Sequence, residues 1–131
     1  MKKYIGTKVV SAKPMTKGEA FERNLLKAGV EIDDTQSAED GYMVEYEDGY
    51  TSWSPKEVFE KAYKLSENFL DRLIIEESDL NEKIIKLHHF IQSKEFIPLS
   101  ENQQKLMKEQ YEIMIKYHNI LKLRIENERK N

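Results

Sequence analysis

Two long amphipathic stretches, separated by one proline-containing break, dominate the second half of the chain. Residues 68–93 and residues 101–128 each carry apolar residues at steps of three, four and seven positions. This spacing is typical of a helix that buries one stripe against another helix. Pro98 lies between the two stretches and ends the first helix, while Ser100 and Gln103 form a capping box at the start of the second. The pattern predicts an antiparallel hairpin of two long helices.

The predicted hairpin carries more apolar residues than one seam between two helices can cover. The two stripes consist of Leu73, Leu80, Ile84, Leu87 and Ile91, and of Met107, Tyr111, Met114, Tyr117, Leu121 and Ile125. Outside them lie Leu70, Ile74, Ile75, Ile85, Ile115, Ile120 and Leu123. Wide apolar faces need a further layer, which either an amino-terminal sheet or a second hairpin could supply. We favour the second hairpin and expect a homodimer, because helices of about 27 residues reach about 40 Å and outreach a small sheet.

The amino-terminal half carries the signals of short strands. Residues 42–46 alternate at period two, and Asp48-Gly49 favours a type I′ turn into a return strand over residues 50–53. Residues 3–12 contain consecutive valines and predict another strand. We therefore expect a small antiparallel sheet of three or more strands.

Two shorter helices and one loop accompany the predicted strands. Thr16 opens a T-x-x-E capping box, and the helix after it is expected to end at Gly29. Ser54 is expected to cap a helix whose first position is Pro55. Residues 31–40 are polar and acidic and predict a loop.

These elements predict an α+β protein. A small amino-terminal antiparallel β-sheet with a short helix is followed by a long carboxy-terminal antiparallel helical hairpin. We place the β-rich module at residues 1–55 and the hairpin and dimerisation region at residues 56–131. At this length the two parts are expected to form one compact unit.

Composition excludes several classes of protein. The chain has no Cys, which excludes a disulfide framework, a thiolate zinc site and a cysteine nucleophile, and suits a reducing cytosol. No apolar run approaches the roughly 18 residues of a membrane span, and we expect no signal peptide. The net charge of -3 disfavours binding to duplex nucleic acid, which needs a basic face.

Residues that could support catalysis are sparse. His88 and His89 are adjacent, so a helix would point them about 100° apart and not toward one metal ion. The carboxylate pairs of the first long helix lie in a charged, solvated face, and no glycine-rich phosphate loop occurs. We expect a protein that is not an enzyme and that uses no metal or cofactor.

The break between the long helices is the strongest candidate for a binding site. Phe90 and Phe96 flank the amino end of the last helix, where unpaired N–H groups attract anions and an aromatic ring could stack a base. A buried hairpin cap is the alternative interpretation. The rings of the predicted sheet, Tyr42, Tyr46, Tyr50 and Trp53, could also stack bases, but we favour packing within the sheet, because the period-two alternation already accounts for them.

Three stretches of the sequence resemble phage proteins. The strings KYIGTKVVSAKPMTKGE and DGYMVEYEDGYTSWSPKEVFEKAY resemble an amino-terminal module of phage-encoded proteins, and residues 72–124 resemble the helical part of small phage proteins. The helical pattern is Phe90, Phe96, Leu99, Gln104, Met107, Gln110, Met114, Tyr117, Leu121 and Arg124. Together the stretches resemble the first family of Thoeris anti-defence sponges, which sequester nucleotide signals of bacterial immune systems. Only the acidic loop around residues 30–40 falls outside the resemblance.

The resemblance implies a binder without catalytic activity that works in the host bacterial cytoplasm. Its implied ligand is glycocyclic ADP-ribose, and cyclic oligonucleotides are the implied ligands of a second site. The implied assembly is a homodimer through the helices, which could extend to a hexamer.

The resemblance also implies the roles of individual residues. An aromatic ring would stack the adenine, polar groups would bind the ribose, and basic groups would face the phosphates. The candidate ligand site therefore consists of Phe90, Phe96, Ser100, Asn102, Lys56 and Arg124, and the candidate second site of Thr16, Lys17 and Arg23. The alternative function is a phage interaction or assembly protein whose helical bundle binds a protein partner. Hydrolysis of the signal is the weakest alternative, because no catalytic set of residues is visible.

Overall fold

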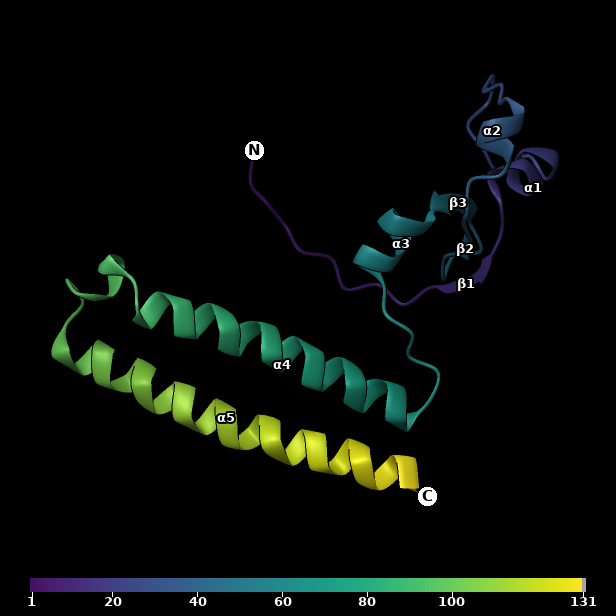
Figure 1. Ribbon diagram of the computed structural model, residues 1–131. Helices are drawn as coiled ribbons and strands as arrows, with labels where there is room; N and C mark the ends of the chain where they lie inside the picture. Colours follow the sequence, from purple (N-terminus) through teal and green to yellow (C-terminus); the bar gives the residue numbers. More distant parts are fainter. Residues whose placement is uncertain (131) are drawn as a thin grey trace. The chain divides into compact units, whose positions relative to one another are not determined.

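The computed structural model describes residues 1–130 and has an α+β fold (Figure 1). The chain divides into two compact units, Met1–Lys64 and Leu65–Asn131. The first unit contains a three-stranded sheet with three short helices, and the second contains a long helical hairpin. The α+β prediction is confirmed.

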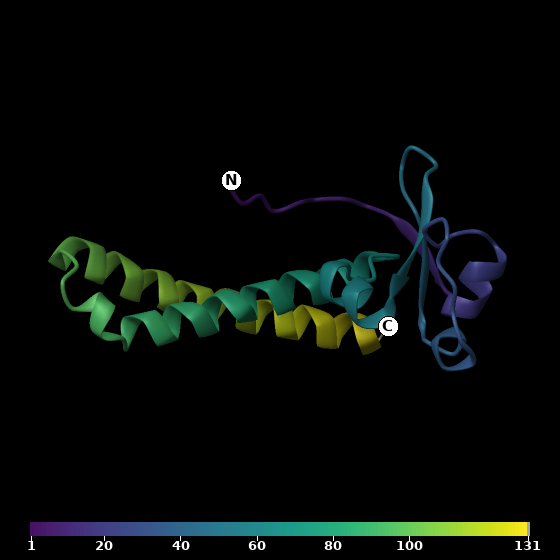
Figure 2. The ribbon, with the colours of Figure 1, turned by 90° about the horizontal axis from the view of Figure 1, so that it is seen from above.

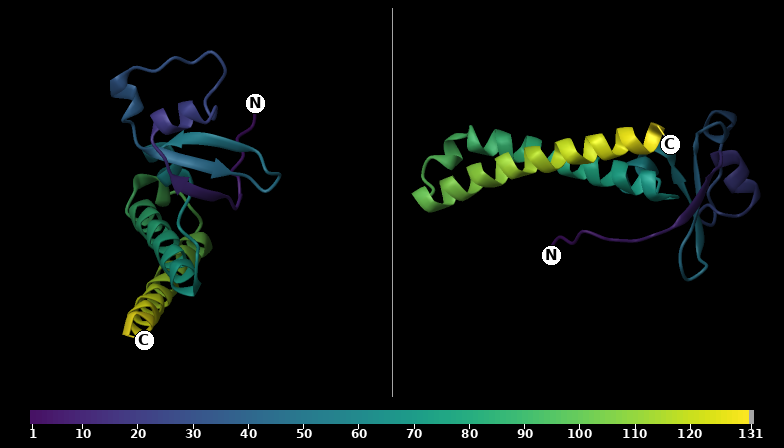
Figure 3. Two further views of the ribbon diagram at one scale, coloured as in Figure 1. Left: turned by 90° about the vertical axis from the view of Figure 1, so that its right-hand side faces the viewer. Right: turned by 90° about the horizontal axis from the view of Figure 1, so that it is seen from below.

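An antiparallel sheet forms the centre of the first unit. Its strands are β1 (Ser11–Pro14), β2 (Gly41–Glu45) and β3 (Thr51–Pro55), in the order β1-β2-β3 (Figure 3). The predicted strand over residues 3–12 is wrong in its bounds, because only Ser11–Pro14 pairs with β2 and residues 1–10 form no regular element. Strand β2 is only five residues long and ends at Glu45, the partner of Ser11, so it offers no further backbone groups to residues 1–10.

The turn between β2 and β3 differs from the predicted type. A type I′ turn needs a positive φ at both central residues, but within the turn only Gly49 has one, at 88°. The Gly49 N–H donates to the Tyr46 carbonyl at 2.9 Å, and the Tyr46 N–H donates to the Tyr50 carbonyl at 2.9 Å. The prediction of a hairpin is therefore confirmed, whereas the prediction of a type I′ turn is wrong.

Two short helices lie between β1 and β2. Helix α1 (Lys17–Glu22) begins as predicted at Thr16, whose hydroxyl accepts the Glu19 N–H at 3.2 Å. The helix does not reach Gly29, because Asn24 adopts a left-handed backbone with φ of 58° directly after it. The predicted acidic loop contains one helical turn, α2 (Asp34–Ser37), which is stabilised by a reciprocal capping box between Asp33 and Gln36.

Helix α3 (Lys56–Ala62) follows β3 without an intervening loop. Ser54 was predicted to cap this helix, and that prediction is wrong. Ser54 still pairs with Tyr42 in the sheet, so Pro55 takes the cap position and supplies no side-chain hydrogen bond. The sheet thus determines where α3 begins, in place of a capping side chain.

The core of the first unit is small. Met15, Ala20 and Val44 are its buried apolar residues. The Trp53 indole N–H donates to the Met15 carbonyl at 2.8 Å, which ties β3 to the segment between β1 and α1. Gly41 lies against the Trp53 ring, where any side chain would clash.

The second unit is the predicted antiparallel hairpin. Helices α4 (Phe69–Ile91) and α5 (Glu101–Lys130) run side by side along their length (Figures 1 and 2). A short 3₁₀ turn, η1 (Lys94–Phe96), lies in the bend between them. The buried seam consists of Leu73, Leu80, Ile84, Leu121 and Ile125.

The seam leaves many apolar side chains of the hairpin uncovered. Leu70, Ile74 and Ile115 pack against its margins. The exposed ones are Leu65, Phe69, Ile85, Phe90, Ile97, Leu106, Ile113, Tyr117, Ile120 and Leu123. His118 on α5 and Glu77 on α4 form a partly buried polar pair, with His118 Nε2 and Glu77 Oε1 2.7 Å apart.

Candidate functional site

Side-chain hydrogen bonds fix the bend of the hairpin. The Ser93 hydroxyl donates to the Phe90 carbonyl at 2.6 Å at the end of α4. The Gln104 side-chain amide, one turn into α5, donates to the carbonyls of Phe96 and Ile97 at 3.1 Å each. These bonds satisfy backbone groups that the end of α4 and the turn leave without helical partners, so the bend is an ordered platform.

Phe90 and Phe96 meet in the bend, as the sequence predicts. Their ring centroids lie 6.4 Å apart with perpendicular planes, the edge-to-face geometry that aromatic quadrupoles favour. Phe96 is 8% exposed and belongs to the buried interior of the bend, whereas Phe90 is 36% exposed. Phe90 is therefore the ring of the pair with a surface that a planar ligand could cover.

The first turn of α5 supplies polar groups beside these rings. The Ser100 hydroxyl oxygen accepts the Gln103 N–H at 3.1 Å, so it is already used as the helix cap. Asn102 is exposed in the same turn, and its side chain can donate and accept hydrogen bonds. Of these two candidates, Asn102 is the one free to change partners without uncapping α5.

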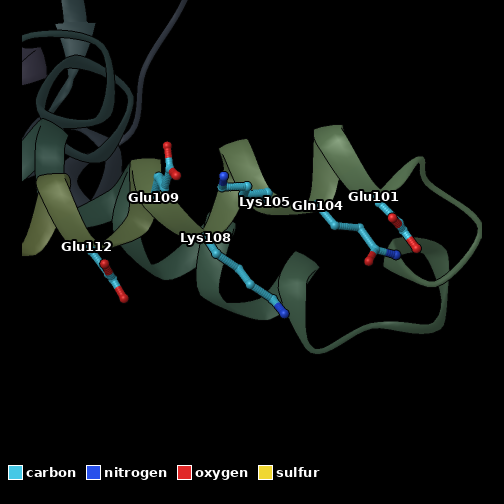
Figure 4. Close-up of a pocket in the computed structure, with 6 residues that line it drawn as sticks. All are labelled: Glu101, Gln104, Lys105, Lys108, Glu109 and Glu112. Carbon is cyan, nitrogen blue, oxygen red and sulfur yellow. The ribbon is translucent and has the colours of Figure 1, made fainter.

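Two lysines lie on α5 close to the bend, and sequence reasoning did not include them in the site. Lys105 and Lys108 line an open depression of about 290 Å³ together with Glu101, Gln104, Glu109 and Glu112. Figure 4 shows these six side chains along α5, with the two lysines pointing in different directions. The Lys108 ammonium lies 5.7 Å from the centroid of Phe96, within the range of a cation–π contact. Lys105 and Lys108 follow the predicted cap at Ser100 by five and eight residues, so the helix start alone would have placed both within roughly two turns of the bend.

Arg124 does not join the bend within one chain. Its guanidinium carbon lies 5.7 Å from the centroid of Phe69, the first residue of α4, at the opposite end of the hairpin. The separation along α5 from Asn102 is about 33 Å at 1.5 Å per residue. Lys56 is exposed at the start of α3 and belongs to the first unit.

The candidate second site lies around α1. Thr16 caps the helix, and Lys17 is its first residue. The Lys17 ammonium lies 3.6 Å from a Glu39 carboxylate oxygen and 5.9 Å from the Trp53 ring centroid, so its charge already has partners. Arg23 is exposed at the C-cap of α1, more than one turn away from Thr16.

The first unit contains two aromatic groups that the sequence did not single out as sites. Tyr42, Phe59 and Tyr63 form a stack, with centroid separations of 4.3 Å and 5.0 Å. The Tyr42 hydroxyl donates to Glu60 at 2.8 Å, and this hydrogen bond, with smaller effects of burial and of the Glu60 charge, raises the pKa of Tyr42.

The second aromatic group lies at the tip of the β2–β3 hairpin. The rings of Tyr46 and Tyr50 stack with centroids 5.8 Å apart, and the Lys8 ammonium lies 5.3 Å from the Tyr46 centroid. They line a cavity of about 450 Å³ that also contains the carboxylates of Glu47 and Asp48.

The hairpin is similar to a known protein family. Residues 67–127 match the family model described as Sequestin, a range that covers all of α4, the bend and most of α5. The match spans just under half of the chain and supports a sequestering protein. No curated protein and no solved structure matches the chain.

The described residues contain neither a metal-binding cluster nor a membrane-spanning helix. Within residues 1–130, no group of three or more His, Asp or Glu side chains is arranged to hold a metal ion. No helix in the same range is both long enough and apolar enough to cross a membrane.

Proposed function

We propose that the protein sequesters a cyclic nucleotide signal of the cyclic ADP-ribose type and holds it without cleaving it. The observation that carries this proposal is the Sequestin match over residues 67–127, because the matched segment contains the whole bend. In this proposal the protein is a phage anti-defence sponge that works against Thoeris immunity in the cytoplasm of the infected bacterium. Glycocyclic ADP-ribose is the proposed ligand.

The chemistry of the bend supports such a ligand. Phe90 offers an aromatic face for adenine, and Lys105 and Lys108 offer two ammonium groups for a pyrophosphate. Asn102 offers a side chain that can donate to and accept from ribose hydroxyls. Three glutamates around the lysines keep the net charge of the site close to zero. A long polyanion needs a strongly basic surface, so the site is better suited to a small anion that is held by individual hydrogen bonds.

The expected interaction free energies are sufficient for tight binding. Stacking on one ring contributes about 1–3 kcal/mol, and each hydrogen bond to a charged group about 1.5–3 kcal/mol before the cost of association. Nanomolar affinity needs about 12 kcal/mol. One stack with several charge-assisted bonds reaches that range only if groups from more than one element converge on the ligand.

Calorimetric titration with a cyclic ADP-ribose-type nucleotide tests this function. The wild type is expected to bind, and Phe90→Ala should bind about 5- to 150-fold more weakly through the lost stack. Lys108→Ala should also weaken binding. Phe21→Ala is the matched control, because Phe21 is a similarly exposed phenylalanine of the first unit and its loss should leave affinity unchanged.

The two possible failures of this experiment have different meanings. A wild type that gives no binding signal would overturn the sponge proposal. A wild type that binds, together with a Phe90→Ala variant that binds equally well, would keep the function and overturn the site at the bend.

A protein-interaction function is the second candidate, and one observation favours it. Exposed apolar side chains run along α5 outside the seam with α4, and such patches commonly mark interaction surfaces. In that case a phage or host protein would occupy this face, and the titration with nucleotide would show no binding.

A further inference from the structure

The open cavity at the tip of the β2–β3 hairpin has no role in the proposed function. Its volume is about 450 Å³, and two stretches of the first unit line it. One is residues 7–9, and the other is the turn with Tyr46, Glu47, Asp48 and Tyr50. The cavity therefore lies within the first unit and shares no residue with the bend of the helical hairpin.

Two tyrosine rings give this cavity an aromatic wall. Tyr46 and Tyr50 stack with their centroids 5.8 Å apart and an angle of 30° between their planes. Tyr50 is 64% exposed, so much of its ring surface is open to a ligand. The face of an aromatic ring carries a negative potential and attracts cations. The tyrosine pair therefore favours a positively charged ligand.

The carboxylates of the same turn favour a cation as well. Asp48 Oδ1 accepts the Tyr50 N–H at 3.0 Å, so part of this carboxylate stabilises the turn. Within residues 1–130 the Glu47 carboxylate forms no ion pair, and neither carboxylate pairs with Lys8. Two carboxylates and one ammonium group leave one negative charge in excess in the cavity. A cation from outside the chain would neutralise that charge.

Lys8 shows that the cavity accommodates an ammonium group. Its Nζ lies 5.3 Å from the centroid of the Tyr46 ring, within the range of about 6 Å for a cation–π contact. In the described part of the chain, the Lys8 side chain forms neither a hydrogen bond nor an ion pair, and residues 1–10 form no regular element. A cation–π contact at an exposed position is weak, so the ammonium group of another molecule can replace that of Lys8.

We propose that this cavity binds a lysine side chain from an extended segment of another protein. The incoming ammonium group lies against the tyrosine pair and forms an ion pair with Glu47, in competition with Lys8. Thr7 and Val9 line the cavity together with Lys8, so the residues on both sides of a lysine fit there too. This fit favours a peptide segment over a free polyamine. The inference concerns the first unit and does not rest on the proposed function.

The natural segment itself supplies the probe for this site. The acetylated and amidated pentapeptide Gly-Thr-Lys-Val-Val, which copies residues 6–10, is added to the full-length Lys8→Gln variant. NMR signals of the Tyr46 and Tyr50 rings report binding. The control peptide carries norleucine, an uncharged side chain of similar length, in place of the lysine.

The two peptides should differ clearly in affinity. The lysine peptide is expected to bind about 3- to 30-fold more tightly than the norleucine peptide, which is the combined effect of an exposed cation–π contact and an exposed ion pair. The wild type should bind the lysine peptide more weakly than Lys8→Gln does, because its own lysine competes. Equal binding of the two peptides to Lys8→Gln, or no binding of either, would overturn the proposal and leave Lys8 as a mere anchor of its own segment.

Second substitutions in the Lys8→Gln variant test the groups that hold the ammonium. Glu47→Gln should lower the preference for the lysine peptide about 2- to 5-fold, because the ion pair is lost while both rings remain. Glu45→Gln is the matched control, since Glu45 is also exposed but does not line the cavity. Tyr50→Leu should lower the preference by a similar factor, whereas Tyr63→Leu, in the other aromatic group, should not. Equal effects of Glu47→Gln and Glu45→Gln would indicate attraction by overall charge alone and overturn the site.

Two further titrations distinguish the source of the ammonium group. At physiological ionic strength, the diamine putrescine should bind Lys8→Gln more weakly than the lysine peptide does, because it lacks the flanking residues. Tighter binding of putrescine would overturn the peptide as the occupant. Unlabelled wild type added to isotopically labelled Lys8→Gln should leave the Tyr46 and Tyr50 signals unchanged. A shift of those signals would show that Lys8 of a second copy enters the cavity, and would overturn another protein as the partner.

Discussion

At the scale of single residues, two serines before helices show what a cap requires. Ser100 precedes α5 and accepts the Gln103 N–H, whereas Ser54 precedes α3 but remains paired in the sheet. We expect Ser100→Ala to lower the free energy of unfolding by about 1 kcal/mol through the lost cap. Ser54→Ala, the matched control, should change it by less than half of that. Chemical denaturation of both variants measures the difference, and equal effects would contradict this account of the helix starts.

Gly41 is the residue where the first unit tolerates no side chain. A Cβ atom there would overlap the Ser54 carbonyl oxygen and the Trp53 ring. Gly41→Ala should therefore open the sheet and cost about 1–3 kcal/mol of stability, the usual range for overpacking. Gly6→Ala is the control, since a Cβ at Gly6 meets no atom within 4 Å. Tryptophan fluorescence during denaturation reports on Trp53, and an unchanged transition for Gly41→Ala would contradict the steric argument.

Sequence reasoning brought Phe90 and Phe96 together at the bend but could not tell which of the two rings is accessible. The pairing of Phe90 and Phe96 could be predicted, because both flank one helix break. The difference in burial between the two rings could not be predicted, because it depends on the three-dimensional path of the chain through the bend. The distance of Arg124 from the bend was already implicit in the predicted length of the last helix.

At the scale of elements, the long helices were more predictable than the short ones. Sustained apolar periodicity defined α4 and α5 almost to the residue. The bounds of β1, α1 and α3 depended on contacts between elements. Strand β1 extends only as far as its pairing with β2, and α3 begins directly after Pro55, the last residue that pairs in the sheet. The helical turn in the acidic loop follows from the Asp33 and Gln36 capping box, a local signal that was overlooked.

The hairpin seam makes a prediction at the same scale. Leu121 is fully buried between α4 and α5, whereas Leu123, two positions later, is 64% exposed. Leu121→Ala should lower the free energy of unfolding by about 2–5 kcal/mol through the lost contacts and the cavity. Leu123→Ala removes the same atoms from a surface position and should cost less than about 0.5 kcal/mol. Thermal or urea unfolding compares the pair, and similar losses would mean that Leu123 is also covered in the folded protein.

At the scale of the whole molecule, the two units differ in the features that could bind a ligand or a partner. The first has a small core and open aromatic groups, and the second has a rigid bend, a stripe of exposed apolar residues and the similarity to Sequestin. The proposed function therefore draws on the second unit. A sponge must hold its ligand tightly and leave it unchanged, so its binding energy has to exceed the cost of association.

Recovery of the bound nucleotide tests this central claim most directly. The protein is mixed with the cyclic ADP-ribose-type nucleotide, separated from unbound nucleotide by gel filtration, and then heat-denatured, and the released small molecule is identified by mass spectrometry. The account predicts that the nucleotide elutes with the protein and returns with its mass and retention time unchanged. A cleaved or rearranged product would show that the protein is an enzyme, and nucleotide that never elutes with the protein would show that it is not a sponge for this class of signal.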